Sequence, residues 1–400
     1  MRRLIAFVLC CVALAAASAA VDPFRQAKTA IKTKKNLDEA ESALVQLANA
    51  AETQRDKRAR AFNMAAQVAL RIHEVENEKM YLRKSPDSLR FFSSVLRMFQ
   101  YVLQCDSVES TVNERGRQRV DFARQNRAMR DRNRRNLLQG GKWMMRSRRY
   151  AEAYSYLDVY CRADSAALAA DTARARVACL AATCAYASGN MRGLLRYADT
   201  AMAVSADARR FLEYKAKAQL SLADTAGWMQ SLAEGVRRYP SSTYFFLSLC
   251  DRLRAESRYA EAIDCSRYAI NHCPDSIMYH YALCLTYRRM GDHDNCLDAL
   301  SQLLMRDNHF APAYLLRGAC LMDKAADFEQ AACTDTRHPD YRRNRERLLA
   351  IYREALVPAE IYRRMRPDDS PRWAPLLYRI YYTLNMGHEL SEIESIMRGM

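Results

Sequence analysis

Residues 243–276 read TYFFLSLCDRLRAESRYAEAIDCSRYAINHCPDS, one period of a pattern that recurs every 34 residues over residues 175–311. The eighth position of each period holds a small residue: Ala182, Ala216, Cys250, Cys284 and Gly318. The closing position holds Ala206, Pro240, Pro274 and Asn308 in turn. A small residue at one fixed position lets two helices cross closely, while larger residues such as Phe246 and Leu249 pack toward the next period. The pattern predicts stacked helix pairs.

Short motifs within the periods identify the kind of repeat. Arg258–Ala262 and Arg149–Ala153 both read RYAEA, and Gly291 and Gly189 stand at the turns. In period and motifs the chain resembles the tetratricopeptide (TPR) repeat family. The resemblance implies an all-α fold, a right-handed superhelical solenoid of antiparallel helix pairs with degenerate capping repeats at both ends. No pair can bury its apolar face alone, so stacking supplies a continuous core.

The first twenty residues have the features of a secretory signal. Arg2 and Arg3 precede the apolar run Leu4–Ala17, and Ala17–Ala19 fits an A-x-A cleavage site. We therefore predict a protein exported to the periplasm or envelope of a Gram-negative bacterium, with no membrane span after the signal is removed. A membrane anchor is the alternative, but the apolar run is shorter than the stretch of about 20 residues that a membrane-spanning helix needs. A lipoprotein signal would require a small residue in place of Leu9.

The chain is predicted to contain five regions. These are a signal peptide (1–20), a degenerate TPR-like region of two helix pairs (21–112), an Arg-rich helical strip leading into the first clear repeat (113–149), a TPR array (134–323), and a C-terminal region (324–400). Residues 73–84 are predicted to form a linker, and residues 323–340 an inserted loop. Residues 341–366 form a long basic helical stretch in which Pro358 is expected to kink or split the helix. Residues 373–397 form a capping helix pair.

The positive charge is concentrated in one stretch. The chain has a formal net charge of +16, and residues 113–149 hold twelve Arg and one Lys against three acidic residues. The candidate anionic docking strip, here called the Arg strip, comprises Arg115, Arg117, Arg119, Arg124, Arg127, Arg130 and Arg134. Of these, Arg127, Arg130 and Arg134 are expected to share one helical face. It is either a solvated surface helix or a docking site for acidic protein, lipid head groups or phosphate-bearing polysaccharide. Nucleic acid is disfavoured by export and by the absence of interleaved aromatic residues.

The resemblance also implies a binding groove. In TPR proteins the first helix of each pair lines the concave side with its positions 2, 5, 9, 12 and 13. Carried onto this chain, the groove set is Arg135, Lys142, Arg146, Arg176, Tyr186, Arg210, Lys217, Tyr244, Arg254, Tyr281, Arg288 and Arg289. A basic groove with tyrosines suits an extended acidic peptide. The alternative is that these side chains only keep the groove hydrated.

No motif for catalysis or cofactor binding is found in the sequence. His73, with the glutamates that follow it, is expected to lie in a solvated turn rather than at a metal site, and His280 is expected to pack in the core. Eleven cysteines follow the signal; Cys250 and Cys284 are predicted to be buried thiols, and a disulfide between Cys265 and Cys296 is an open alternative.

The sequence therefore predicts a non-enzymatic protein–protein interaction scaffold, without cofactor or metal. It would hold acidic or extended protein segments in its basic groove. The alternative is an envelope-associated structural protein that docks on anionic lipid or polysaccharide through the Arg strip.

Overall fold

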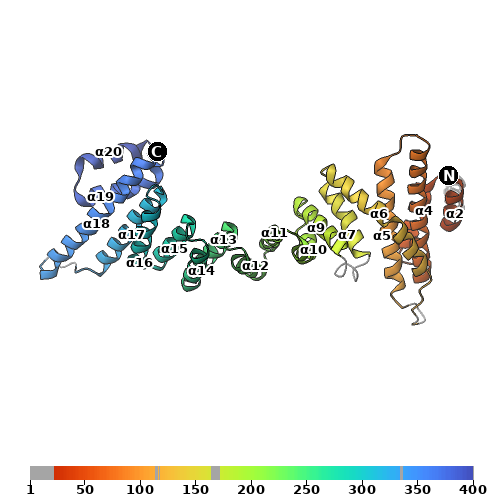
Figure 1. The fold of residues 1–400 in the computed structure, drawn as a ribbon, viewed down its shortest axis with the longest axis horizontal. Coiled ribbons are helices and arrows are strands. Elements are labelled where there is room, and N and C mark those ends of the chain that lie inside the picture. Colours follow the sequence, from red (N-terminus) through yellow and green to blue (C-terminus); the bar gives the residue numbers. More distant parts are fainter. Residues whose placement is uncertain (1–21, 113–115, 117, 164–171, 334–336, 400) are drawn as a thin grey trace, which may run out of the picture. The chain divides into compact units, whose positions relative to one another are not determined.

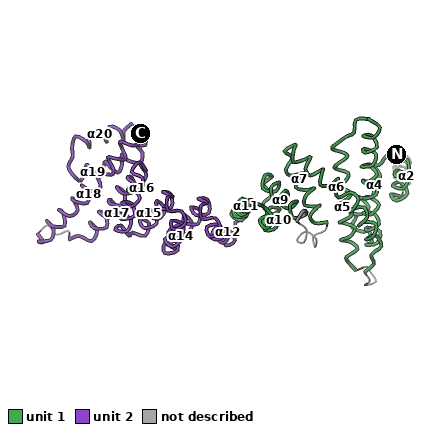
Figure 2. The backbone as a smooth tube through the Cα atoms, in the orientation of Figure 1, with its two compact units in different colours: residues 1–222 green, residues 223–400 purple. Residues whose placement is uncertain are grey.

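The computed structural model describes residues 22–112, 116, 118–163, 172–333 and 337–399, and these residues form α-helices joined by short turns (Figure 1). The predicted signal lies outside them. The described residues contain no strand, so the all-α prediction is confirmed. No described helix has the length and apolar composition of a membrane span. The chain divides into two compact units, residues 1–222 and 223–400 (Figure 2).

Unit 1 is a series of helices, each of which packs on its neighbour in the chain. They are α2 (Pro23–Thr33), α3 (Leu37–Asn49), α4 (Arg55–Tyr81), α5 (Ser88–Glu109), α6 (Ala123–Arg146), α7 (Tyr150–Arg162), α9 (Thr172–Ala187), α10 (Met191–Val204) and α11 (Ala208–Ser221). Helices α2 to α5 form two pairs, which share an apolar core that includes Phe24, Leu44, Phe62 and Ile72.

The prediction for residues 73–84 is wrong, because α4 continues through most of this segment. His73 and Glu76, expected in a solvated turn, are buried. The Nδ1 atom of His73 lies 3.0 Å from the Phe91 carbonyl oxygen, and its Nε2 atom lies 3.1 Å from the Asn136 side-chain nitrogen. A carbonyl only accepts and an amide NH₂ only donates, so the imidazole is neutral with its proton on Nδ1. Burial lowers the pKa of His73, which favours the same form.

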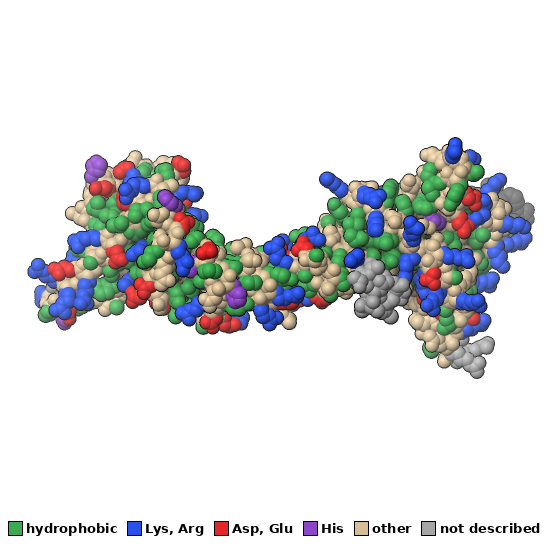
Figure 3. Space-filling view, viewed as in Figure 1, with side chains coloured by type: hydrophobic (Ala, Val, Ile, Leu, Met, Phe, Trp, Pro, Cys, Tyr) green, Lys and Arg blue, Asp and Glu red, His purple; other side chains and the backbone are tan. Residues whose placement is uncertain are grey.

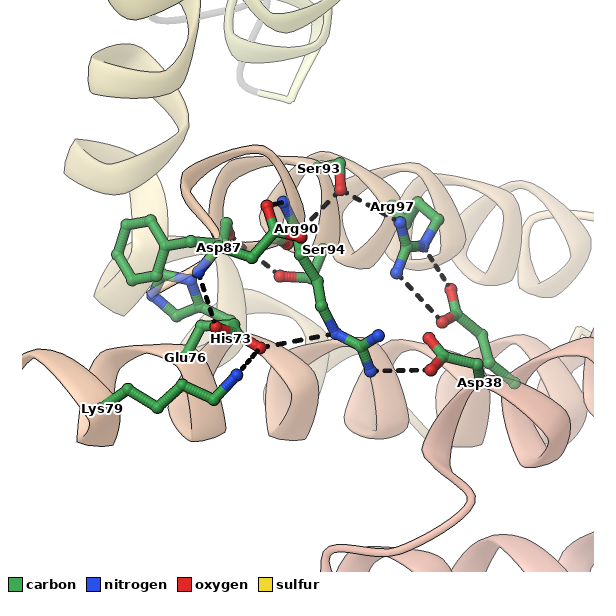
Figure 4. A network of polar contacts seen from close by, with 11 residues as sticks. Asp38, His73, Glu76, Lys79, Asp87, Arg90, Ser93, Ser94 and Arg97 are labelled. Atoms are coloured by element: carbon green, nitrogen blue, oxygen red, sulfur yellow. Dashed lines mark hydrogen bonds and ion pairs between the residues drawn. The ribbon is translucent and has the colours of Figure 1, made fainter. Parts of the chain in front are cut away.

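A polar network holds α5 against α3 and α4 (Figure 4). From α5, Arg97 donates to both carboxylate oxygens of Glu41 in α3, at 2.6 and 3.2 Å. Arg90 lies between Asp38, at 2.7 Å, and Glu76, at 3.6 Å (Figure 4). Because an unpaired buried carboxylate is costly, Glu41 and Glu76 need these partners. The network therefore fixes the long helices of the N-terminal region by charge as well as by apolar packing.

Small residues allow the close helix crossings that the repeat pattern predicts. A Cβ atom on Gly141 of α6 would lie 3.1 Å from the Leu157 side chain of α7. A Cβ atom on Gly235 would lie 2.2 Å from the Phe245 ring, where nothing larger than hydrogen fits. Because no Cβ separates the two elements, the larger neighbour packs directly on the helix backbone.

Unit 2 continues the helical repeat. Its helices are α12 (Thr225–Arg238), α13 (Thr243–Ala255), α14 (Tyr259–His272), α15 (Ile277–Met290), α16 (His293–Arg306), α17 (Ala311–Ala331), α18 (Pro339–Met365), α19 (Ser370–Leu384) and α20 (Gly387–Arg398). Each packs on the next, and the first helices α13, α15, α17 and α19 also contact one another in that order. This second set of contacts places the predicted groove positions of successive pairs side by side.

Two predictions for the C-terminal region are wrong, namely the inserted loop and a helix split at Pro358. The inserted loop predicted over residues 323–340 is in large part helical, because α17 continues to Ala331. Pro358 does not split the stretch that contains it, since α18 runs without interruption on both sides. Pro358 is buried, and α18 packs extensively on α17. Burial along this interface offsets the one backbone hydrogen bond that a proline removes from a helix.

The described cysteines are free thiols. Cys250 and Cys284 are fully buried, as predicted for small core positions. The alternative of a disulfide between Cys265 and Cys296 is wrong, because both are free thiols. Cys265 contacts Cys250, and Cys296 contacts Cys320.

Candidate binding faces

In unit 1, the predicted groove cations of α6 are accessible to solvent. Arg135 and Arg146 are exposed, and Lys142 is half-buried. Among the described residues, no carboxylate forms an ion pair with any of the three. Their charges are therefore available to an external anion.

Helices α9 and α11 together build an aromatic and cationic cluster. The rings of Tyr186 in α9 and Tyr214 in α11 stack with their centroids 3.8 Å apart and their planes 9° from parallel. The ammonium nitrogen of Lys217 lies 5.9 Å from the Tyr186 centroid, within the range of a cation–π contact. Tyr214 was not among the predicted groove residues. It stands outside the five lining positions, and it reaches the face because its ring leans onto the neighbouring repeat.

Two arginines extend this cluster. Arg176 of α9 and Arg210 of α11 are exposed, and the positive charge of both acts on the half-buried thiol of Cys179. Burial raises the pKa of Cys179, and the two guanidinium groups oppose that rise. Arg210 lies 3.5 Å from Asp207, in a pair about half exposed on both sides. We call this surface the α9–α11 basic face; its residues are Arg176, Tyr186, Arg210, Tyr214 and Lys217.

In unit 2, the predicted groove residue Arg254 is used within the fold. Its side chain is only 12% exposed. One guanidinium nitrogen lies 3.1 Å from the Ala282 carbonyl oxygen and 3.4 Å from the Thr286 hydroxyl, both on α15. The other terminal nitrogen pairs with Asp251. This guanidinium therefore joins α13 to α15, and its donors are directed at the protein.

The cations of α15 differ from each other. Arg288 pairs with Asp323 of α17 at 2.7 Å. Arg289, the next residue, is exposed and has no ion pair among the described residues. Within unit 2, Arg289 is thus the predicted groove cation with an available charge.

The two tyrosines predicted in unit 2 are half-buried and pack on phenylalanines. The centroid of Tyr244 lies 5.3 Å from that of Phe245, and Tyr281 meets Phe310 edge-on at 5.3 Å. Burial raises the pKa of Tyr281. Both rings are more strongly engaged in repeat packing than the sequence indicates.

Part of the Arg strip lies outside the described residues, namely Arg115 and Arg117. Arg124 and Arg127 are exposed on the first turns of α6. Arg119 is also exposed, and it forms an ion pair with Asp121. On the face shown in Figure 3, Lys and Arg side chains are spread over each unit with Asp and Glu among them, rather than gathered into a single patch.

The rest of the Arg strip is turned toward the protein. Arg130 pairs with Asp106 of α5, and the Arg134 guanidinium lies over the Tyr160 ring, 5.3 Å from its centroid. Arg127, by contrast, is exposed. The helical spacing places the three arginines on one face, but that face is partly covered by α5 and α7.

Sequence reasoning missed a polar cleft of about 570 Å³ between α5 and α7. The buried charged side chain of this cleft is that of Asp158, which accepts hydrogen bonds from Arg196 and Tyr197, each at 2.7 Å. The other polar side chains of the cleft include Gln100, Gln104, Tyr154 and Arg162. Arg196 and Tyr197 both come from α10 of another helix pair, so no short motif in the sequence could have indicated the site.

No protein-family model matches the chain, and no curated protein matches it. Among solved structures, the chain is similar to the C-terminal part of a TPR repeat-containing protein from Cytophaga hutchinsonii, with 13% identity over 64% of this chain and 98% of that chain and a TM-score of 0.36. It is similar to YrrB, described as a TPR protein with an unusual peptide-binding site, with 13% identity over 44% of this chain and 88% of that chain and a TM-score of 0.33.

It is also similar to human IFIT1, solved as a dimer with m7Gppp-AAAA, with 15% identity over 91% of this chain and 72% of that chain and a TM-score of 0.38. At these identities and TM-scores the likeness is one of general fold type and does not extend to binding residues.

Proposed function

We propose that this chain is a non-enzymatic protein–protein interaction scaffold that binds an extended acidic segment on the α9–α11 basic face. The observation that carries the proposal is the stacked pair of Tyr186 and Tyr214, with the Lys217 ammonium near one ring and two exposed arginines on the same two helices. Arg176 is exposed and has no ion pair among the described residues, so its charge is available to a ligand.

The chemistry of this face suits a peptide with carboxylate side chains. A guanidinium can hold a carboxylate with two parallel hydrogen bonds, as Arg176 and Arg210 could do for successive acidic residues. The tyrosines offer rigid apolar area with little entropy to lose on binding. Because the cations belong to two neighbouring first helices, an extended segment can reach both, whereas a compact one would reach only one.

The proposed location is the periplasm or envelope of a Gram-negative bacterium. Its support is the basic start, apolar run and small-residue cleavage site in residues 1–20. Cell fractionation with N-terminal sequencing tests this part separately. A mature N-terminus at Ala20 or Val21 in the periplasmic fraction is the expected result, and an intact N-terminus in the cytoplasm would refute it.

The binding proposal is tested by fluorescence anisotropy with a labelled ten-residue peptide of alternating Glu and Ala. The variant R176E/R210E/K217E is expected to weaken binding about 100-fold, because three exposed contacts of about 1 kcal/mol each are lost or reversed. The matched control is Arg192→Glu, an exposed position of α10 in the same repeat, which should change affinity less than about twofold. Equal affinities for the triple variant and the parent would refute the proposal.

A second candidate function is docking on anionic lipid or polysaccharide, supported by the exposed Arg124 and Arg127. Sedimentation with phosphatidylglycerol vesicles distinguishes it from peptide binding. Under this candidate, R124E/R127E abolishes vesicle binding and R176E/R210E/K217E leaves it intact. Under the scaffold proposal, R124E/R127E leaves peptide affinity unchanged.

A further inference from the structure

Where α16 meets α17 in unit 2, two thiols, an imidazole and a carboxylate lie together. The Nε2 atom of His293 lies 2.7 Å from Asp327, and its Nδ1 atom lies 3.8 Å from the sulfur of Cys320. Cys296 and Cys320 belong to the same buried cluster, and the Cys296 sulfur lies 3.4 Å from the Cys284 carbonyl oxygen. This order of carboxylate, imidazole and thiol is the arrangement that activates sulfur nucleophiles.

The thiols of Cys284 and Cys320 differ in pKa because their surroundings differ. Burial raises the pKa of Cys284 to about 12, as expected for a thiol in an apolar core. For Cys320, the hydrogen bond from Cys296 lowers the pKa to about 7, with His293 acting in the same direction against the effect of burial. The nearby carboxylate of Asp323 opposes the lowering.

We propose that Cys320 and Cys296 form an oxidisable dithiol site for peroxide. In this site Cys320 is the attacking thiolate, Cys296 is the resolving thiol, and His293 is a positioning residue held by Asp327. This inference is independent of peptide binding, since none of these four residues belongs to the α9–α11 basic face.

The chemistry balances with hydrogen peroxide as the oxidant. The Cys320 thiolate attacks one peroxide oxygen, the O–O bond breaks, and the departing hydroxide takes a proton to become water. Cys320 is then a sulfenic acid. The Cys296 sulfur attacks that of Cys320, the S–O bond breaks, and the departing hydroxide leaves as a second water with the Cys296 proton. In total two thiols are oxidised to a disulfide, and one peroxide is reduced to two waters.

The path from solvent to the buried Cys320 sulfur is short. Cys320 is fully buried, but the His293 side chain beside it is 12% exposed and Asp327 is 67% exposed. His293 is the first residue of α16, so opening one helix turn brings solvent to the thiol. Peroxide is about the size of water and needs no larger opening. A bulky disulfide substrate would not reach the sulfur, so peroxide is the oxidant class that fits.

The test treats the full chain with a small excess of hydrogen peroxide, blocks remaining thiols, and maps disulfides by non-reducing mass spectrometry. A peptide pair linked through Cys296 and Cys320 is the expected product. In C296S the Cys320 sulfenic acid persists and is captured by dimedone when the protein is unfolded in its presence. In H293N the oxidation rate at pH 7 falls at least about fivefold, since the pKa of Cys320 rises when the imidazole is removed. Circular dichroism checks that each variant is folded.

The pH dependence of peroxide oxidation in the unaltered protein gives a second measurement that does not depend on any variant. The rate at which hydrogen peroxide oxidises Cys320 should rise with a midpoint near pH 7, and Cys284 serves as the matched buried control with no rise below pH 9. Equal rates at Cys320 and Cys284, or oxidation that leaves Cys320 reduced, would overturn the proposal.

Discussion

Both units place cations at positions that are predicted to line the groove, but the two units use them differently. In unit 1, Arg176 is exposed and has no ion pair among the described residues. In unit 2, the Arg254 guanidinium is hydrogen-bonded to α15, and Arg288 forms an ion pair with Asp323 at 2.7 Å. Position within the repeat thus predicts which helix face carries a side chain. Whether its charge is available depends on what the next repeat places opposite it.

Reversing charge in one unit at a time should give the largest difference. R176E/R210E/K217E is expected to weaken binding of the Glu–Ala peptide about 100-fold. In unit 2, R288E/R289E should weaken it less than about threefold, because Arg288 already shares its charge with Asp323. Anisotropy titrations at one ionic strength measure both. A larger loss from the unit 2 variant would reverse the assignment of the binding face.

Removing the guanidinium of Arg254 should affect stability rather than binding. Arg254→Ala leaves the Ala282 carbonyl and the Thr286 hydroxyl without this donor. The expected loss is about 2 kcal/mol in the free energy of unfolding of unit 2. Urea titration with hydrogen exchange of α15 measures it. The control, Arg289→Ala, lies at an exposed groove position and should cost less than about 0.5 kcal/mol. Weaker peptide binding by the folded R254A protein would show that this arginine does serve the ligand.

Freeing a cation in unit 2 should make its face behave more like that of unit 1. Asp323→Asn removes the partner of Arg288, and both side chains of this pair are partly exposed. Such a pair is worth about 0–1 kcal/mol, so affinity for the acidic peptide should rise up to about threefold. Asp264→Asn is the control with the same change in net charge, since Asp264 is exposed on α14 and has no ion pair among the described residues. A gain in both variants would indicate a general charge effect instead of a released arginine.

The repeat spacing predicts the regular helices well. The first helices α13, α15 and α17 begin at Thr243, Ile277 and Ala311, which are the first positions of successive periods. The small residues at the eighth position are buried where the helices cross, as Cys250 and Cys284 show. These features depend on local periodicity and side-chain volume, both of which can be read from a single sequence.

What the sequence does not predict depends on contacts between distant residues. His73 appears in a polar stretch that suggests a turn, yet α5 and α6 cover it and supply its two hydrogen-bond partners. Pro358 would be expected to interrupt an isolated helix, but α17 stabilises the helix around it. The spacing likewise gives the position of Arg254 without its bonds to α15. In each case the deciding partner lies on another helix, and no local pattern specifies it.

The smallest effect is expected at the ion pair between Asp207 and Arg210 of the α9–α11 basic face. Asp207 is the N-cap of α11, where it accepts from the Arg210 backbone N–H at 3.4 Å, and it also pairs with the Arg210 side chain at 3.5 Å. Asparagine caps helices as well as aspartate does, so Asp207→Asn removes the charge and keeps the cap. Because the pair is half exposed, peptide affinity should rise less than about twofold. A gain as large as that of D323N would mean that both units neutralise their arginines equally, and the distinction between the two faces would then rest on the stacked tyrosines alone.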